Sequence, residues 1–297
     1  MCRPASGTAS IILGCAIAMT SVAGLTATAL PEAGTSGDDR AAESTTSHEI
    51  ISEAALKEGR DLLRSMQFAQ ESFSFARVRW SGEAGRRGSS RWATDFPDAD
   101  LALAARLSEW TSLRVGEGGT VVSLTDESLT DHAMLYLSEP GMLRLSPAEI
   151  AGLRKYLESG GFLMADDFWG ESEWKNLRSQ LQRVLPDSEF VDLPLGHQIF
   201  QQPFRLNLRP QVCSIAHAMA ARESGITWER SDGKDVHYWG ITDDSGRLMA
   251  VLCHNTDLAD GWERAGDDAW YAQEFSEKRA FPMAMNIIVA AVGTKPN

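Results

Sequence analysis

The chain has 297 residues, of which 43% are hydrophobic, and its formal net charge at pH 7 is −13. This length and apolar content suffice for one large α/β domain with a full core. A surface this acidic repels phosphate backbones, so it excludes nucleic acid as a partner and disfavours anionic membrane surfaces.

The first 29 residues have the pattern of a signal peptide. Arg3 is their one charged residue, residues 11–25 are uncharged and largely apolar, and a small-x-small cleavage site ends at Ala29. We therefore predict that residues 1–29 are a signal peptide, that the protein is exported to the periplasm or beyond, and that the mature chain has no membrane span. An uncleaved anchor and a lipid anchor at Cys15 are the alternatives.

The rest of the chain divides into three predicted parts. Residues 30–47 consist mainly of small and polar residues, which is typical of a flexible linker. Residues 48–68 show the apolar spacing of an amphipathic helix, a helical lead-in that either packs on the domain or acts as a spacer. Residues 69–297 are predicted to form a single α/β domain.

The domain begins with alternating strand and helix signals. Residues 73–80 alternate apolar and polar side chains, as a strand does, and the Gly-, Ser- and Arg-rich residues 81–91 predict a mobile loop. A helix is expected within residues 92–110, with Asp95 or Asp98 as its cap. Further short strands are expected at residues 113–115, 120–124 and 133–137.

The strongest local signal is a capping box from Ser146 to Glu149, with proline at the first helical position. The helix that starts there should end at Gly160. An apolar strand is predicted at residues 162–165, followed by two aspartates and by a second helix at residues 172–185. Together with the preceding strand, this order predicts a right-handed βαβ unit with a further helix.

The C-terminal part carries weaker signals. Asp243 to Gly246 has the composition of a hairpin turn, and residues 247–253 would form the second strand of that hairpin. The remaining elements expected are a strand at residues 189–193, a turn at 196–200 and a buried helix at 282–292. The predicted fold is a three-layer α/β sandwich with a mostly parallel central sheet and an added C-terminal β-hairpin.

Two cysteines, Cys213 and Cys253, follow the predicted signal peptide. In an exported protein a pair of cysteines suggests a disulfide, but spacing in sequence does not establish the required geometry. The alternative is that Cys253, inside the apolar run of the predicted hairpin, is a small buried residue.

A series of motifs in a fixed order resembles a known bacterial family. The motifs are FARVRW, WATDFPDADL, SLTDESLTDHAMLYLSEPG, LRKYLESGGFLMADDFW, GHQIF, HNTDLADGW and NIIVAAVG, between Phe73 and Gly293. Their order resembles the family called domain of unknown function 4159. The resemblance implies a flavodoxin-like or class I glutamine-amidotransferase-like domain without an established activity.

Amidotransferase-like folds place a nucleophile elbow where this chain has Ala165, Asp166 and Asp167. A carboxylate cannot form the thioester of cysteine amidotransfer, so that reaction is excluded at this position. The thiol of Cys253, next to His254, has no flanking glycines, and neighbouring strand residues point to opposite faces, which argues against a catalytic thiol there.

The carboxyl ends of parallel strands meet at one edge of a sheet, where open α/β folds bind ligands. The side chains expected at that edge are Arg79, Trp80, Asp126, Glu139, Asp166, Asp167 and Trp169. Three interpretations are open: a glycosidase-like pair of carboxylates with Trp169 against a sugar, a hard-cation site at Asp126, Asp166 and Asp167, or simple capping of the following helix.

The histidines and cysteines predict no metal site, because no pair has the spacing of a recognised zinc motif. His197 is a candidate binding residue within the predicted turn. The preferred hypothesis is an exported, non-catalytic domain that binds a small ligand or an envelope protein and needs no cofactor. The alternative is a secreted hydrolase with Asp166, Asp167 and Glu139 as catalytic candidates, acting on carbohydrate or using a divalent cation.

Overall fold

The structure is a computed structural model that describes residues 49–68, 72–81, 91–116 and 118–293. All of these residues belong to one compact unit. The predicted signal peptide, the predicted linker and most of the predicted 81–91 loop lie outside the described residues.

A seven-stranded sheet forms the centre of the described domain. All neighbours from the first strand to the fifth pair in parallel, and β8 is antiparallel to both of its neighbours. In spatial order the strands are β4 (Val121–Val122), β2 (Phe75–Val78), β5 (Met134–Ser138), β6 (Phe162–Phe168), β9 (Leu248–His254), β8 (His237–Thr242) and β7 (Val191–Asp192). The predicted mostly parallel sheet is confirmed.

The predicted C-terminal hairpin is part of this central sheet. Its strands β8 and β9 pair across the turn at Asp243, whose Oδ1 accepts the backbone N–H groups of Ser245 and Arg247. β9 also pairs with β6, so the hairpin completes the sheet instead of forming a separate layer. A second, two-stranded sheet joins β1 (Ser72–Phe73) to β3 (Arg114–Val115).

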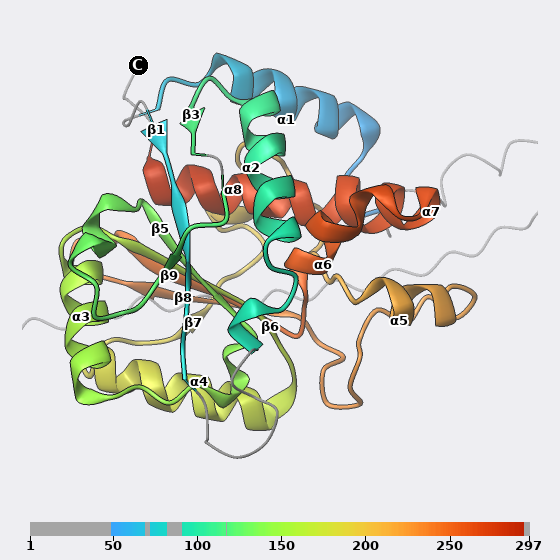
Figure 1. Cartoon of the computed structure of the whole chain (residues 1–297). Coiled ribbons are helices and arrows are strands. Elements are labelled where there is room, and N and C mark those ends of the chain that lie inside the picture. The colour runs from blue at the N-terminus through green and yellow to red at the C-terminus, as the bar shows by residue number, and fades with distance from the viewer. Residues whose placement is uncertain (1–48, 69–71, 82–90, 117, 294–297) are drawn as a thin grey trace, which may run out of the picture. The chain divides into compact units, whose positions relative to one another are not determined.

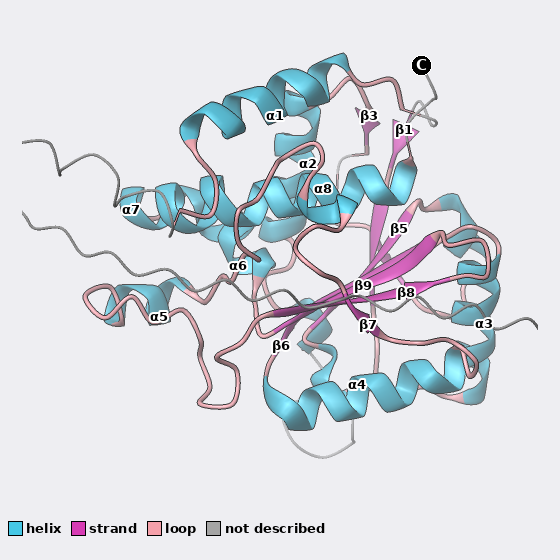
Figure 2. Ribbon diagram, turned by 180° about the vertical axis from the view of Figure 1, so that it is seen from behind, coloured by secondary structure: helices cyan, strands magenta, loops and turns pink. Residues whose placement is uncertain are grey.

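Helices cover both faces of the sheet (Figures 1 and 2). One face carries α3 (Pro147–Glu158) and α4 (Gly170–Val184). The other face carries α1 (Glu53–Ser65), α2 (Asp98–Trp110), α6 (Leu258–Glu263) and α8 (Phe281–Val292). Two further helices are short, α5 (Ile215–Ala220) and α7 (Ala269–Tyr271). A π-helical segment, Ala272–Ala280, directly follows α7 and continues into α8.

The alternation of side chains along β5 explains the two cores. Met134 and Tyr136 lie in the core under α8, whereas Leu135 and Leu137 lie in the core under α3 and α4. Because both faces are covered, the strand reads as a continuous apolar run instead of an alternating one. The three-layer α/β sandwich predicted from the sequence is therefore the observed fold.

Of the two predicted helix caps, the structure confirms the one at α3 and contradicts the one at α2. The capping box of α3 is confirmed, since Ser146 Oγ accepts the Glu149 N–H and the Glu149 carboxylate accepts the Ser146 N–H. The cap predicted for α2 is wrong: neither Asp95 nor Asp98 caps it, because the N-cap is Pro97, which has no side-chain bond to offer. The carboxylate of Asp95 therefore does not cap α2.

The helical lead-in packs on the domain and is not a spacer. Leu56 and Leu63 of α1 are buried in the core, and Gly59 lies so close to the ring of Phe204 that a Cβ atom would collide with it. Cys213 and Cys253 are both buried free thiols, so the structure has no disulfide between them. Among the described helices, none combines the length and the apolar character needed to cross a membrane.

Candidate functional site

The two consecutive aspartates form a β-bulge at the carboxyl end of β6. The strand is in register with β9 up to Ala165 and again from Phe168, but Asp166 and Asp167 oppose the single residue Cys253. A bulge of this kind inserts one residue and redirects the side chains that follow. Asp167 takes up the insertion with a left-handed backbone, φ 57°.

Asp166 is completely buried. Its Oδ2 accepts hydrogen bonds from the Tyr136 hydroxyl at 3.2 Å and from the Ala259 N–H at 3.1 Å, whereas its Oδ1 has no hydrogen-bond partner among the described residues. Burial penalises the charged form and raises the pKa of Asp166 to about 7. This carboxylate is therefore placed at considerable electrostatic cost.

Asp167 is half-buried beside Asp166. Its Oδ1 accepts the indole N–H of Trp169 at 3.0 Å. Burial, followed by the negative charges of Glu139, Asp166 and Asp95, raises the pKa of Asp167 well above its ordinary value. The strand-to-helix turn that would hold a nucleophile elbow thus holds a carboxylate on a left-handed backbone.

Four acidic residues that the sequence analysis did not assign to the site lie beside this pair. Burial raises the pKa of Asp257, and the next contributions come from the charges of Asp167, Asp95, Asp260 and Asp166. The carboxylate cluster, as we call it, comprises Asp95, Glu139, Asp166, Asp167, Asp257, Asp260 and Glu263. The motif HNTDLADGW contains Asp257 and Asp260 at the start of α6. Their spacing of three residues is the sequence pattern that could have indicated them.

The tightest part of the cluster joins two segments far apart in the chain. One ligand oxygen each from Asp95, Asp260 and Glu263 lies within 4.8 Å of the other two. Asp260 and Glu263 lie one helical turn apart on α6, and Asp95 belongs to the turn before α2. Burial, with the charges of Asp260 and Glu263, raises the pKa of Asp95 to about 8.

A buried ion pair holds the turn that carries Asp95. Arg77 of β2 and Asp100 of α2 pair with both side chains almost fully buried. The same guanidinium donates to the backbone oxygens of Trp92, at 3.1 Å, and Thr94, at 2.8 Å. Arg77 therefore holds the chain on both sides of Asp95, by bonds to the backbone before it and by the ion pair with Asp100 after it.

Residues with a left-handed backbone lie at the carboxyl edge of the sheet. Among the described residues, the non-glycine residues with positive φ are Asp95, Glu139, Asp167 and Asn255. Glu139 follows β5, Asp167 lies in the bulge of β6 and Asn255 follows β9, so three of them mark carboxyl ends of neighbouring parallel strands. Such conformations cost energy and are retained where the surroundings fix them, often at functional sites.

Positive charge only partly balances the cluster. Among the described residues, ion pairs to its members come from Arg91, at 2.9 Å from Glu139, and from Arg264, at 3.0 Å from Glu263 and 3.9 Å from Asp260. Arg91 and Arg264 both retain more than a third of their side-chain exposure, so they lie at the margin of the cluster. Within the described part of the chain, Asp166, Asp167 and Asp257 have no ion pair.

Several side chains expected at this edge lie differently. Trp80 and Trp169 are buried, and the Trp80 indole donates to the Ser138 oxygen at 2.9 Å. Arg79 is exposed and stacks over the ring of Trp92. Asp126 is exposed and accepts the Ser123 N–H within its own turn. Glu139, Asp166 and Asp167 are the predicted residues that meet in the cluster.

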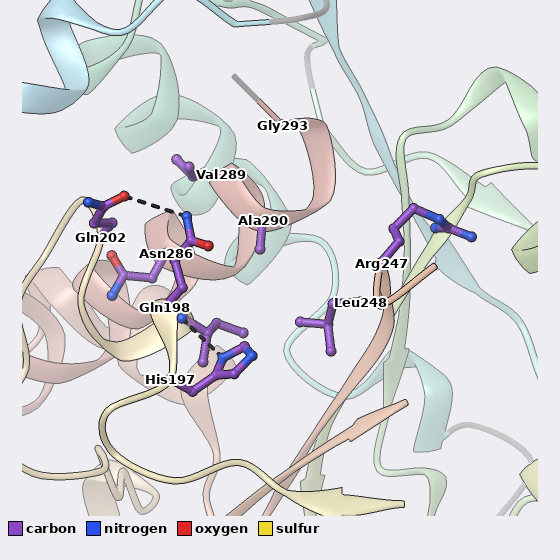
Figure 3. A pocket seen from close by; sticks show the side chains of 11 residues that line it. His197, Gln198, Gln202, Arg247, Leu248, Asn286, Val289, Ala290 and Gly293 are labelled. Carbon is purple, nitrogen blue, oxygen red and sulfur yellow. Dashed lines mark hydrogen bonds between the residues drawn. The ribbon is translucent and has the colours of Figure 1, made fainter. Parts of the chain in front are cut away.

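His197 lies at the opposite, amino edge of the sheet, in a pocket of about 320 Å³ (Figure 3). Arg247 borders the same pocket and donates to the oxygen of Gly161, the residue before β6. The imidazole Nδ1 of His197 accepts the Ile199 N–H. His197 is thus separated from Asp166 by the length of a strand.

Comparison with known families agrees with the motifs. Residues 74–292 match the family described as domain of unknown function, DUF4159. The chain belongs to this family. No curated protein matches the chain closely enough to be reported as a relative. Family membership accordingly assigns no activity to the carboxylate cluster.

Proposed function

We propose that this protein is an exported, non-catalytic binding domain whose ligand carries positive charge and binds at the carboxylate cluster. The location supports this proposal, because open α/β sheets bind ligands at the carboxyl ends of their strands. The charge balance supports it as well, since among the described residues the ion pairs to these seven carboxylates come from Arg91 and Arg264 at the margin of the cluster.

One observation carries the proposal: the Oδ1 atom of Asp166 is completely buried and has no hydrogen-bond partner. Buried polar atoms in folded proteins nearly always have a partner, and a buried charge without one is strongly unfavourable. A cationic ligand bound at the half-buried members of the cluster would compensate the charge of Asp166 through its electric field, without touching that side chain. These members are Asp95, Glu139, Asp167 and Glu263.

The test is a thermal-shift screen of the mature protein with spermidine, with an arginine-rich peptide and with divalent cations. We expect at least one cationic probe to raise the unfolding temperature of the wild type. Asp257→Asn should weaken that response, whereas Asp126→Asn, at an exposed acid outside the cluster, should not. A screen in which no cation stabilises the protein would overturn the proposal.

Export rests on the N-terminal pattern and has its own test. The protein should be recovered from the cell envelope or the medium of its bacterial host, with Leu30 as its first residue by N-terminal sequencing. Recovery in the cytoplasm with an intact N-terminus would contradict export without affecting the carboxylate cluster.

A secreted hydrolase is the second candidate. The observation that favours it is the pKa of Asp166, which burial raises to about 7, a value suited to a general acid near neutral pH. Its complete burial argues the other way, because a substrate cannot reach this side chain in the described conformation. Asp167, which is half-buried, is the more accessible of the two.

The hydrolase candidate is tested by a substrate screen that includes oligosaccharides. Any activity found should be abolished in both Asp166→Asn and Asp167→Asn and retained in Asp126→Asn. Unchanged turnover in both cluster variants would remove these aspartates from the reaction.

A further inference from the structure

We propose that the ligand of the carboxylate cluster is a hard divalent cation, bound by Asp95, Asp260 and Glu263. This inference rests on the proposed function and narrows it from any cationic ligand to a metal ion. The three side chains come from the turn before α2 and from α6, so a bound ion would join two segments about 165 residues apart.

The spacing of the oxygens suits such an ion. One oxygen from each residue lies within 4.8 Å of the others. Two oxygens on opposite sides of a bound Ca²⁺ are separated by roughly 4.6–5.2 Å, twice the usual Ca–O distance. Three carboxylates can therefore bind one ion from the described positions, and water would complete its coordination.

Asp95 and Asp260 both keep an oxygen available. The Oδ2 of Asp95 has no hydrogen-bond partner. The Oδ2 of Asp260 accepts the Ile215 N–H at 2.7 Å and the Tyr271 hydroxyl at 2.8 Å, and these bonds fix the orientation of the carboxylate. Its other oxygen faces Arg264 only at 3.9 Å. This resembles a metal ligand held in place by surrounding hydrogen bonds.

The Oδ1 atom of Asp166, which has no partner among the described residues, is a separate indication of a cation. This side chain has no solvent exposure, and its Oδ2 binds the N–H of Ala259, the residue next to Asp260. The Asp166 carboxylate therefore lies against the segment of α6 that carries Asp260. A cation bound beside this segment would compensate the buried negative charge of Asp166.

The donor atoms indicate the class of metal. Asp95, Asp260 and Glu263 offer carboxylate oxygens and no imidazole or thiolate, a set that suits Ca²⁺, Mg²⁺ or Mn²⁺ better than Zn²⁺ or Cu²⁺. Sites of this kind in extracellular modules bind Ca²⁺ with dissociation constants on the order of 10⁻⁴ to 10⁻³ M. Saturation is accordingly expected at millimolar Ca²⁺.

A substitution at Arg264 should change cation affinity in the opposite direction to substitutions of the ligands. Its Nε lies 3.0 Å from Glu263 Oε2, so the guanidinium competes with a cation for that carboxylate. Arg264→Gln removes the competitor and should increase cation affinity. A variant that tightens binding is informative, because misfolding or general damage to the domain would not produce it.

The experiment is isothermal titration of the mature protein with CaCl₂, MgCl₂ and MnCl₂, and separately with spermidine. Asp95→Asn is the main variant, since asparagine tolerates the left-handed backbone that Asp95 adopts at φ 59°. Glu263→Gln is a second variant at an independent ligand. Asp126→Asn is the matched control, an exposed aspartate that bonds its own turn.

We expect a metal affinity that falls at least about tenfold in Asp95→Asn and Glu263→Gln, rises in Arg264→Gln and is unchanged in Asp126→Asn. The inference is overturned if no metal saturates the wild type, or if both ligand variants bind it equally well. Binding of spermidine without any metal binding would overturn the metal site and leave the proposed function standing. Failure of every cation would overturn both.

Discussion

The two edges of the sheet use polar residues in opposite ways. At the amino edge, Arg247 pairs with Asp243 and donates to the oxygens of Gly161 and Leu157, and Asn286 bonds both the N–H and the oxygen of Phe204. At the carboxyl edge, buried carboxylates lie together, and Asp95 and Asp166 have oxygens without partners. The amino edge has a well-defined pocket whose polar walls are largely satisfied by the chain itself.

This contrast favours the carboxyl edge over the amino-edge pocket as the place where a cation would bind. Figure 3 shows Asn286 and Gln202 lining the amino-edge pocket together, with the Arg247 side chain directed away from it. Polar groups that already have hydrogen bonds within the protein are stabilised little by a ligand, whereas buried acids without a partner are stabilised strongly by a bound cation. The central claim is therefore that the carboxyl edge is the binding edge.

The largest effect is expected from removing the ion pair beneath the carboxyl edge. Arg77→Met leaves the buried Asp100 without its partner and releases the turn before Asp95. Loss of one partner of a buried pair typically costs about 3–5 kcal/mol. We expect a decrease of that size in the free energy of unfolding, measured by urea denaturation, together with loss of cation binding.

Arg79→Ala is the matched control for Arg77→Met. Arg79 lies two residues further along the chain, is exposed and stacks over Trp92. An exposed cation–π contact contributes about 0.5–1 kcal/mol. Equal destabilisation by the two substitutions would contradict the structural role assigned to Arg77.

A gain in stability is expected from Asp166→Asn. The folded-state pKa of Asp166, about 7, exceeds the ordinary value for an aspartate in the unfolded chain. The unfolded state therefore releases its proton first, and this residue destabilises the fold progressively as pH rises from about 4 to 7. Asparagine cannot ionise, so at pH 8 with chelator we expect an increase of about 2–4 kcal/mol in the free energy of unfolding.

The stability difference between Asp166→Asn and the wild type should depend on pH. Denaturation at pH 8 and at pH 4 should show an advantage of the variant that shrinks on acidification, because the wild-type carboxyl is protonated in both states at low pH. An advantage that stays constant or grows toward pH 4 would contradict a pKa of Asp166 that burial raises. Added Ca²⁺ should also reduce the advantage at pH 8.

A smaller effect is expected at the amino edge. Asn286→Leu removes two hydrogen bonds to the buried backbone of Phe204 and should lower the free energy of unfolding by about 2 kcal/mol. Cation affinity should stay at the wild-type level, because this residue borders the amino-edge pocket and is not a member of the carboxylate cluster. A loss of cation binding in Asn286→Leu would remove the distinction between the two edges.

Local signals account for what was predictable from sequence. The capping box at Ser146, the glycine that ends α3 and the apolar run of β5 each define an element without knowledge of the rest of the chain. Glu139, Asp166 and Asp167 were assigned to the site because each follows or ends a predicted strand. Order along the chain is enough to place such residues at one edge.

The other half of the cluster depends on tertiary contacts. Asp95 reaches the site because Arg77 holds the turn that carries it. The sequence shows only an aspartate in a turn near the start of a helix, a pattern that predicts a helix cap. Asp260 and Glu263 lie on a helix of six residues, too short for a clear apolar period. Conversely, Asp126 follows a predicted strand but bonds its own turn, which sequence order does not reveal.

The central claim is tested most directly by a crystal structure of the mature protein grown with MnCl₂, with anomalous data collected for manganese. We predict an anomalous peak between the carboxylates of Asp95, Asp260 and Glu263, and none in the pocket lined by His197 and Asn286. A fully occupied ion elsewhere, or an empty carboxyl edge in a crystal whose protein binds manganese in solution, would contradict the account.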